Sequence, residues 1–308
     1  ILVAGGAGFI GSNLCEKLIE KNCHVTCVDN LSTGKLDNIS KLIELNNFEF
    51  IKHDIIFKFQ NKIKFDEIYN LACPASPPSY QKDPIHTLKT CTIGTINMLE
   101  LALKCNSKIL QASTSEIYGD PLVHPQNENY WGNVNTTGLR SCYDEGKRCS
   151  ETLFMDYNRK HKLNTKIVRI FNTYGPMMDK NDGRVVSNFI NQAINSEELT
   201  IYGDGNQTRS FMYVSDLVDG IIKSMDTNYS SPINLGNPNE ITMNELADII
   251  LDYTGSSSKK LYKELPSDDP KRRKPNIELA KRTLNWKPNV RFSDGLKKTI
   301  KYYSELND

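Results

Sequence analysis

Short apolar segments alternate with helical patterns along the first half of the chain. Between these segments apolar residues recur at spacings of three and four, as in Ile10, Leu14 and Leu18, which is typical of a helix that packs on a sheet by one face. Strands separated by helices predict parallel βαβ units. We therefore expect an α/β fold with a Rossmann-type doubly wound parallel sheet. Its strands are expected at residues 1–4, 24–28, 48–51, 68–71, 108–111 and 166–170.

The alternation weakens beyond residue 175, where Gly, Asp, Asn and Pro become frequent. We expect residues 1–175 to form the sheet domain. Residues 176–308 are expected to form mainly a smaller mixed α/β lobe, with some of the chain crossing back. In this second half, helical patterns occur at residues 185–194, 217–225, 243–253 and 293–303.

The segment 85–105 carries apolar side chains over an unusually wide surface, among them Ile85, Leu88, Ile93 and Ile96. Such a spread predicts a helix that is buried on more than one side. A dimer interface and a thick core helix both account for it.

Three glycines, Gly5, Gly8 and Gly11, separate the first strand from the first helix. Glycine permits a tight turn and the close approach of backbone N–H groups to a pyrophosphate at a helix N-terminus. The spacing differs from G-x-G-x-x-G, but Asp29 ends the second strand, where a carboxylate holds an adenosine ribose 2′-hydroxyl and repels a 2′-phosphate. The sequence therefore predicts a site for NAD rather than NADP.

Tyr143 and Lys147 stand four residues apart and share one helix face. An ammonium close by favours the phenolate, so we expect Lys147 to lower the pKa of Tyr143 from its usual value near 10. A tyrosine with a lowered pKa is a general base for a sugar or alcohol hydroxyl. A surface Tyr/Lys pair is the alternative.

Polar side chains also follow the expected strands. Thr114, Ser115 and Glu116 come after the strand at 108–111, at the edge where open α/β sheets bind ligands, although they would equally suit a helix cap. Asp54 follows the strand at 48–51 and is a candidate neighbour of an adenine. The basic run 271–274 is suited to bind phosphates or carboxylates. A solvated charged loop and a nuclear-localisation signal are the alternative interpretations of this run.

Charge and composition exclude several classes of protein. Lys and Arg number 38 against 37 Asp and Glu, for a net charge of +1, which gives no support to nucleic-acid or membrane-surface binding. No run of 18 apolar residues is present, so we expect no membrane span and a cytoplasmic, soluble protein. The eight cysteines form no C-x-x-C pair, so we expect reduced thiols and no metal. Because the chain begins inside a strand pattern, we expect that its N-terminus has been trimmed. An N-terminal anchor in the trimmed segment is compatible with this expectation.

Several long stretches resemble the extended short-chain dehydrogenase/reductase family, and within it the UDP-glucuronic acid decarboxylases. They cover essentially the whole chain and include LACPASPPSY at 71–80, STSEIYGDPLVHP at 113–125, RSCYDEGKR at 140–148, RIFNTYGP at 169–176 and DDPKRRKP at 268–275. Met177 departs from the pattern, since the family usually has arginine after Gly-Pro.

The resemblance implies an enzyme that decarboxylates UDP-glucuronate to UDP-xylose through a 4-keto intermediate, with tightly bound NAD that is regenerated in each turnover. It implies catalytic roles for Tyr143, Lys147, Glu116, Thr114, Ser115 and Arg273, with Arg273 at the sugar carboxylate. The expected NAD contacts, besides Tyr143 and Lys147, are Gly5, Gly8, Phe9, Ile10, Gly11, Asp29, Asn30, Asp54, Ile55, Leu71, Ala72 and Thr90. The expected substrate contacts are Tyr80, Lys89, Asn172, Arg184, Asn188, Arg209 and Arg273. A homodimer is also implied.

Three alternatives share the fold. A nucleotide-sugar 4,6-dehydratase acting on UDP- or dTDP-glucose needs an acid for the departing C6 hydroxyl, and in such enzymes the triplet reads Thr-Asp-Glu. Here Ser115 replaces the aspartate, and a serine hydroxyl is a poor acid. A 4-epimerase has no need of Glu116 or Arg273, and a non-catalytic NAD-binding regulator has no need of Tyr143 or Lys147.

Overall fold

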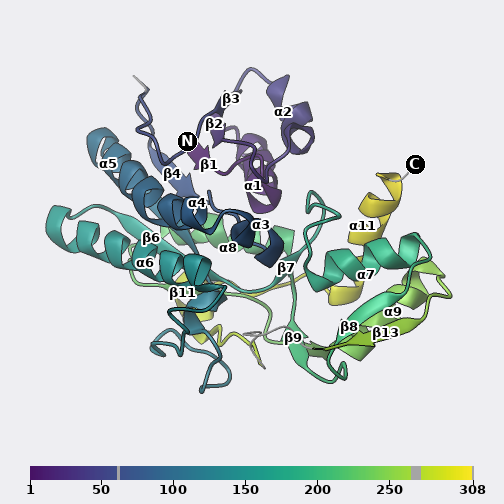
Figure 1. Ribbon diagram of the computed structural model, residues 1–308. Coiled ribbons are helices and arrows are strands. Elements are labelled where there is room, and N and C mark those ends of the chain that lie inside the picture. Colours follow the sequence, from purple (N-terminus) through teal and green to yellow (C-terminus); the bar gives the residue numbers. More distant parts are fainter. Residues whose placement is uncertain (61–62, 265–271, 307–308) are drawn as a thin grey trace.

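A seven-stranded sheet, all of whose strands are parallel, forms the centre of the computed structural model, which describes residues 1–60, 63–264 and 272–306 (Figure 1). The spatial order is β11-β6-β5-β4-β1-β2-β3, and this doubly wound order confirms the predicted fold class. Residues 268–271 of the DDPKRRKP stretch lie outside the described residues. The strands are β1 (Leu2–Ala4), β2 (Val25–Asp29), β3 (Phe48–Lys52), β4 (Glu67–Asn70), β5 (Lys108–Thr114), β6 (Thr165–Ile170) and β11 (Ile233–Leu235).

Helices cover both faces of this sheet because successive strand residues point to opposite sides. In β1, Val3 packs into one core cluster with helices α1 (Phe9–Glu20) and α8 (Val214–Asp226). Its neighbours Leu2 and Ala4 pack into a second cluster with α5 (Thr95–Cys105) and α6 (Ser141–His161). In Figure 1 the helices α4, α5 and α6 lie together on the left of the molecule.

The second half of the chain forms most of a separate lobe, but part of it returns to the sheet. Helix α8 packs on β5 and β6, and β11 pairs with β6. The four predicted helical segments are confirmed as α7 (Val185–Ile194), α8, α9 (Met243–Thr254) and α11 (Phe292–Glu305), whereas α10 (Glu278–Leu284) was not predicted. The division at residue 175 stays a prediction. Short strand pairs complete the lobe: β7 (Thr173–Tyr174) with β10 (Met212–Tyr213), β8 (Leu199–Tyr202) with β13 (Lys260–Lys263), and β9 (Thr208–Ser210) with β12 (Glu240–Thr242).

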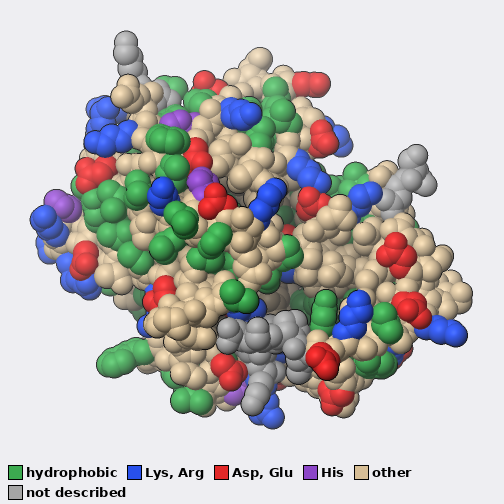
Figure 2. Space-filling view, viewed as in Figure 1, with side chains coloured by type: hydrophobic (Ala, Val, Ile, Leu, Met, Phe, Trp, Pro, Cys, Tyr) green, Lys and Arg blue, Asp and Glu red, His purple; other side chains and the backbone are tan. Residues whose placement is uncertain are grey.

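The segment expected at 85–105 is helical throughout, but not regular. It consists of α4 (Pro84–Lys89), the π-helical η2 (Thr90–Gly94) and α5. Its inner side is buried, yet Ile85, Leu88, Ile93 and Ile96 are 68%, 42%, 44% and 37% exposed. The interpretation as a helix buried on several sides within one chain is therefore wrong for this outer face. Hydrophobic side chains gather over the same region in Figure 2.

Four short helices complete the described fold. They are η1 (Leu36–Ile39), α2 (Ser40–Ile43), α3 (Pro77–Lys82) and η3 (Ser115–Tyr118). None of the described helices has the length and apolar character needed to cross a membrane.

Candidate active site

A cavity of about 360 Å³ opens along the carboxyl ends of the central strands. This edge collects the loops that follow β1, β2, β3, β4, β5 and β6, because parallel strands end on the same side of a sheet. All fourteen residues expected to contact NAD line the cavity. Its wall is completed by Asn172, which follows β6, and by residues beyond 175 that include Met177 and Arg184.

The loop after β1 is a cradle that only glycine can form. Gly5 has φ +79°, and a Cβ on Gly11 would lie 2.1 Å from the Gly5 carbonyl oxygen. Helix α1 therefore begins in direct contact with the turn, and its first residues line the cavity. This close approach fits a dinucleotide pyrophosphate at the helix N-terminus.

Two carboxylates, Asp29 at the end of β2 and Asp54 after β3, also line the cavity. Asp29 is buried and accepts hydrogen bonds from the backbone N–H groups of Ala7 (3.0 Å) and Leu31 (2.8 Å). Burial outweighs these bonds and raises the pKa of Asp29. Asp54 accepts hydrogen bonds from Asn30 and His86, each at 2.8 Å. Burial opposes them, but these and a backbone bond lower the pKa of Asp54.

His86 also lines the cavity and was not predicted. It lies 32 residues from Asp54 in the sequence, and no local pattern connects the two. Asp83 and Pro84 mark the start of the helix that carries His86. This signal shows where the helix begins, but it does not show what its side chains contact.

Tyr143 and Lys147 lie one turn apart on α6, and both are buried. The Lys147 ammonium is 5.7 Å from the centre of the Tyr143 ring and donates a hydrogen bond of 2.8 Å to the carbonyl of Ala112. The ring of Tyr80 stacks on Tyr143 at 5.1 Å between centroids. The predicted pairing on one helix face is therefore present, with an aromatic wall that the sequence did not indicate.

The expected lowering of the Tyr143 pKa is wrong for this structure. Burial raises the pKa of the phenol and the neighbouring Cys73 raises it further, against a hydrogen bond of Thr114 that lowers it. Lys147 directs its ammonium to a backbone carbonyl, so its charge does not overcome the loss of hydration around the ring.

Glu116, which follows β5, is held by two arginines. Arg273 makes a bidentate pair with it at 2.6 and 2.7 Å, and Arg140 adds a third contact at 2.7 Å. Burial would raise the pKa of Glu116, but the charges of Arg273 and Arg140 hold it below its usual value. Thr114 caps the turn by accepting a bond from the Glu116 N–H. The role of Arg140 was not predicted, although it stands three residues before Tyr143 in a stretch that we singled out.

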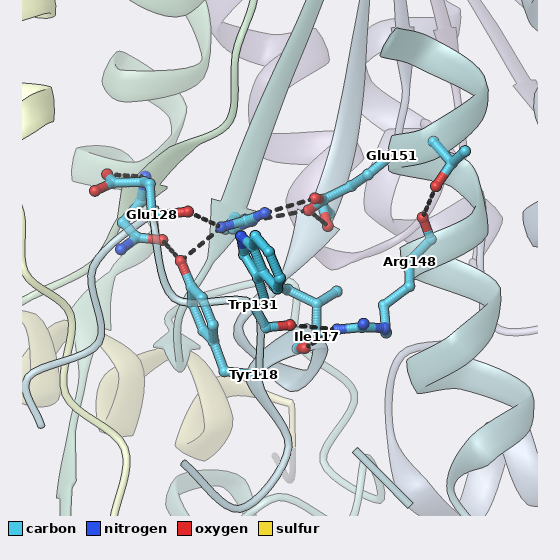
Figure 3. A network of polar contacts seen from close by, with 10 residues as sticks. Ile117, Tyr118, Glu128, Trp131, Arg148 and Glu151 are labelled. Atoms are coloured by element: carbon cyan, nitrogen blue, oxygen red, sulfur yellow. Dashed lines mark hydrogen bonds and ion pairs between the residues drawn. The ribbon is translucent and has the colours of Figure 1, made fainter. Parts of the chain in front are cut away.

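A buried polar network supports the Glu116 turn from behind. Arg169 of β6 binds both carboxylate oxygens of Glu151 at 3.0 and 2.7 Å and donates to the Tyr118 hydroxyl at 2.9 Å. Arg148 donates to the carbonyls of Ile117 and Trp131. Figure 3 shows these side chains tying η3 to α6. The network fixes the orientation of the segment that presents Glu116, because each charged group is paired.

Some of the residues expected to contact the substrate line the cavity and others do not. Asn172 and Arg184 line the cavity, and Arg184 is paired with Asp182. Tyr80 stands behind Tyr143, and Arg273 reaches the site through Glu116. Five of the seven expected substrate contacts do not line the cavity: Tyr80, Arg273, Lys89, Asn188 and Arg209. Lys89 is exposed on α4, Asn188 donates to the Gly183 carbonyl, and Arg209 is buried with its backbone bridged to Arg273.

A family model and several relatives match nearly the whole chain. A family model described as GDP-mannose 4,6 dehydratase matches residues 2–299. UDP-glucuronic acid decarboxylase 1 of Danio rerio is 53% identical over 304 residues, which are 99% of this chain and 72% of that protein. UDP-glucuronic acid decarboxylase 3 of Arabidopsis thaliana is 53% identical over 297 residues, 96% of this chain and 86% of that protein.

Solved structures with the same fold are known. A UDP-glucose 4-epimerase of Thermotoga maritima, solved with UDP-glucose, has a TM-score of 0.91 at 29% identity and covers 100% of this chain and 99% of its own. A UDP-glucuronic acid 4-epimerase of Bacillus cereus, solved with UDP-glucuronic acid and NAD, has a TM-score of 0.89 at 28% identity and covers 99% of each chain.

Proposed function

The chain belongs to the UDP-glucuronic acid decarboxylases of the extended short-chain dehydrogenase/reductase family, and on this ground we propose that it converts UDP-glucuronate to UDP-xylose with bound NAD. The observation that carries the proposal is that the Tyr143–Lys147 pair and the carboxylate of Glu116 line the same cavity. Thr114 lines this cavity together with them, and Glu116 is paired with Arg273 and Arg140. A proton acceptor and fixed positive charge are what an oxidation followed by decarboxylation requires.

The cavity supports a site for NAD through the glycine cradle and the carboxylate of Asp29. When bound, NAD supplies a hydride acceptor and, in its oxidised form, a positive charge that favours a neighbouring phenolate. Lys147 and Tyr143 would contact its nicotinamide end, and Asp29 its adenosine ribose.

The residues of the chain then have distinct tasks. Tyr143 takes the proton of the sugar C4 hydroxyl as C4 is oxidised, and Lys147 stabilises the phenolate. The 4-keto acid loses CO₂ because the ketone stabilises the electron pair left at C5. Arg273 carries a permanent charge that suits the sugar carboxylate. Glu116 and Thr114 position the hydroxyls at the C4–C5 edge.

Ser115 supports decarboxylation over dehydration. It lines the cavity between Thr114 and Glu116, where a 4,6-dehydratase needs an acid for the departing hydroxyl. The low pKa of the paired Glu116 makes this carboxylate a poor acid as well. Neither side chain is therefore suited to donate that proton.

Incubation of the pure protein with UDP-glucuronate, and separately with UDP-glucose, tests the proposal without added reductant. We expect CO₂ and a UDP-pentose from the first substrate, identified by mass and proton NMR, and no reaction of the second. Loss of water from UDP-glucose, giving a 4-keto-6-deoxy sugar, would overturn the decarboxylase and show that Ser115 does not decide the reaction.

We also propose that the chain forms a homodimer through the outer face of α4, η2 and α5. The support is the apolar set Ile85, Leu88, Ile93 and Ile96, which a single chain leaves exposed. A cytoplasmic location stays a prediction.

A further inference from the structure

Two free thiols meet in the wall of the cavity. The sulfur atoms of Cys73 and Cys91 are 3.3 Å apart, in a contact in which either can donate a hydrogen bond. Cys73 follows β4 and lines the cavity, whereas Cys91 lies in η2 and is only 2% exposed. A small oxidant in the cavity therefore has access to Cys73, with Cys91 directly behind it.

The surroundings give the two sulfurs different reactivity. The hydrogen bond from Cys91 lowers the pKa of Cys73; burial opposes this, and the charge of Lys147 lowers the pKa further. The same contact and burial raise the pKa of Cys91. A thiolate is the nucleophilic form of cysteine, so Cys73 is the sulfur that reacts first and Cys91 keeps its proton.

We propose that Cys73 and Cys91 are a dithiol oxidation site, at which a peroxide forms a reversible disulfide that stops turnover at the adjacent Tyr143. The Cys73 thiolate attacks one peroxide oxygen; an S–O bond forms, the O–O bond breaks and hydroxide leaves. Cys91 then attacks the oxidised sulfur. The S–S bond forms, and the hydroxyl leaves with the Cys91 proton as water, so the two sulfurs are oxidised by two electrons and the peroxide is reduced.

The disulfide would disturb the catalytic helix because Cys91 is tightly packed against it. A disulfide bond is about 2.05 Å long, so the sulfurs must approach by about 1.2 Å from their 3.3 Å separation. Helix α6 packs against Cys91 at Gly146, where an added Cβ would lie 2.9 Å from the Cys91 Cβ. The movement must therefore displace the Cys73 loop, which lines the cavity, or η2, which packs on the helix that carries Tyr143 and Lys147.

Other cysteines lack this combination. Cys15 and Cys27 are also neighbours, but both are completely buried and neither lines the cavity. Cys149 is exposed on α6, and among the described residues no other thiol is recorded in contact with it. These three serve as internal controls for the site.

The test treats the intact protein with hydrogen peroxide, blocks the remaining thiols and maps peptides by mass. We expect a peptide pair joined through Cys73 and Cys91 that has lost two hydrogen atoms, a fall in turnover of at least about tenfold, and recovery of both with dithiothreitol. The loss of turnover rests on the proposed function, whereas the mass of the joined peptides does not. If untreated protein shows no decarboxylation, the proposed function fails and the peptide map still decides on the disulfide.

Cys91→Ser should keep the basal turnover and give no joined peptides. Without a resolving thiol, Cys73 should continue to the sulfinic acid, so dithiothreitol should no longer restore turnover. Cys91→Ala is the second variant if the serine lowers the melting temperature, and Cys149→Ser should behave as the wild type. Oxidation of Cys73 without joined peptides, or joined peptides with unchanged turnover, would overturn the proposal.

Discussion

At the scale of single residues, two carboxyl groups near the same arginines behave in opposite ways. Glu116 has both oxygens paired with Arg273 and Arg140, and its pKa is lowered. Asp144 is 7% exposed, and its Oδ1 has no hydrogen-bond partner. Burial, together with the charge of Glu116, raises the pKa of Asp144 to about 7, although Arg140 and Arg273 oppose the shift. Direct pairing, not mere proximity to arginine, decides which carboxyl is ionised.

This difference predicts a pH dependence of stability. Between pH 4 and 7 the native Asp144 binds more protons than its unfolded counterpart, so the free energy of unfolding falls as pH rises through this window and its loss is complete above about pH 7. Asp144→Asn should remove this slope and stabilise the protein at pH 8 by at least about 1 kcal/mol. Urea unfolding at pH 5 and pH 8 measures it. The exposed Asp156→Asn on the same helix is the control, and equal slopes for both variants would contradict the assignment.

The phenol of Tyr143 carries the second residue-level prediction. Tyr143→Phe keeps the ring that stacks on Tyr80 but removes the group that takes the proton. Turnover should fall by a factor of about 10² to 10⁴ while the fold and bound NAD are retained. Steady-state rates and the NAD content of the purified protein measure this. Tyr157→Phe, on the same helix with its hydroxyl bonded to Glu100, should leave both unchanged; near-normal turnover of Tyr143→Phe would remove Tyr143 from the mechanism.

At the scale of elements, the site depends on how closely helices approach the sheet edge. Gly11 lets α1 begin against the β1 turn, and Gly146 lets α6 pack on η2. Helix α1, at the proposed cofactor site, and helix α6, which carries the proposed catalytic groups, can therefore pack this closely because glycine has no side chain at the contact. The same closeness leaves little room for substitution, because interiors are packed as densely as crystals.

Gly11→Ala should separate α1 from the glycine turn, because its Cβ would lie 2.1 Å from the Gly5 oxygen. We expect a loss of about 1 to 3 kcal/mol in the free energy of unfolding and weaker NAD binding, read by thermal unfolding and by the NAD content. Gly8→Ala is the matched control, since its Cβ would meet the same oxygen at 3.3 Å. An equal loss of stability in both variants would show that close approach at Gly11 is not the cause.

At the scale of the whole molecule, Ile85, Leu88, Ile93 and Ile96 of α4, η2 and α5 remain exposed, although the inner side of the same segment is buried. They adjoin α6, with which α4, η2 and α5 are in contact. A partner on this face would therefore pack against the helix layer that carries Tyr143 and Lys147. In the proposed dimer, assembly and the geometry of the site would be coupled through that layer.

Ile93→Glu combined with Ile96→Glu should convert the proposed dimer to a monomer, because a buried unpaired carboxylate is costly. Light scattering should show a fall from twice the mass of the 35.0 kDa chain to the mass of one chain. Ile43→Glu, at a residue 46% exposed on α2, should leave the mass unchanged. A wild-type protein that is already monomeric at micromolar concentration would contradict the dimer.

The sequence by itself determined six of the seven strands of the central sheet, their parallel arrangement, the glycine cradle and the spacing of Tyr143 and Lys147; β11, which is only three residues long, was not predicted. These features follow from periodicity and from the conformational range of glycine, which act between residues close in the chain. Helix α10 escaped prediction because it is only seven residues long, too short for a clear periodic pattern.

Only the tertiary structure decided which groups meet. Glu116 and Arg273 are 157 residues apart, Asp54 and His86 are 32 apart, and Cys73 and Cys91 are 18 apart. The raised pKa of Tyr143 and the exposed face of Ile93 also came from the assembled fold. Burial and charge depend on every neighbour in space, and the packing of one element on another sets those neighbours.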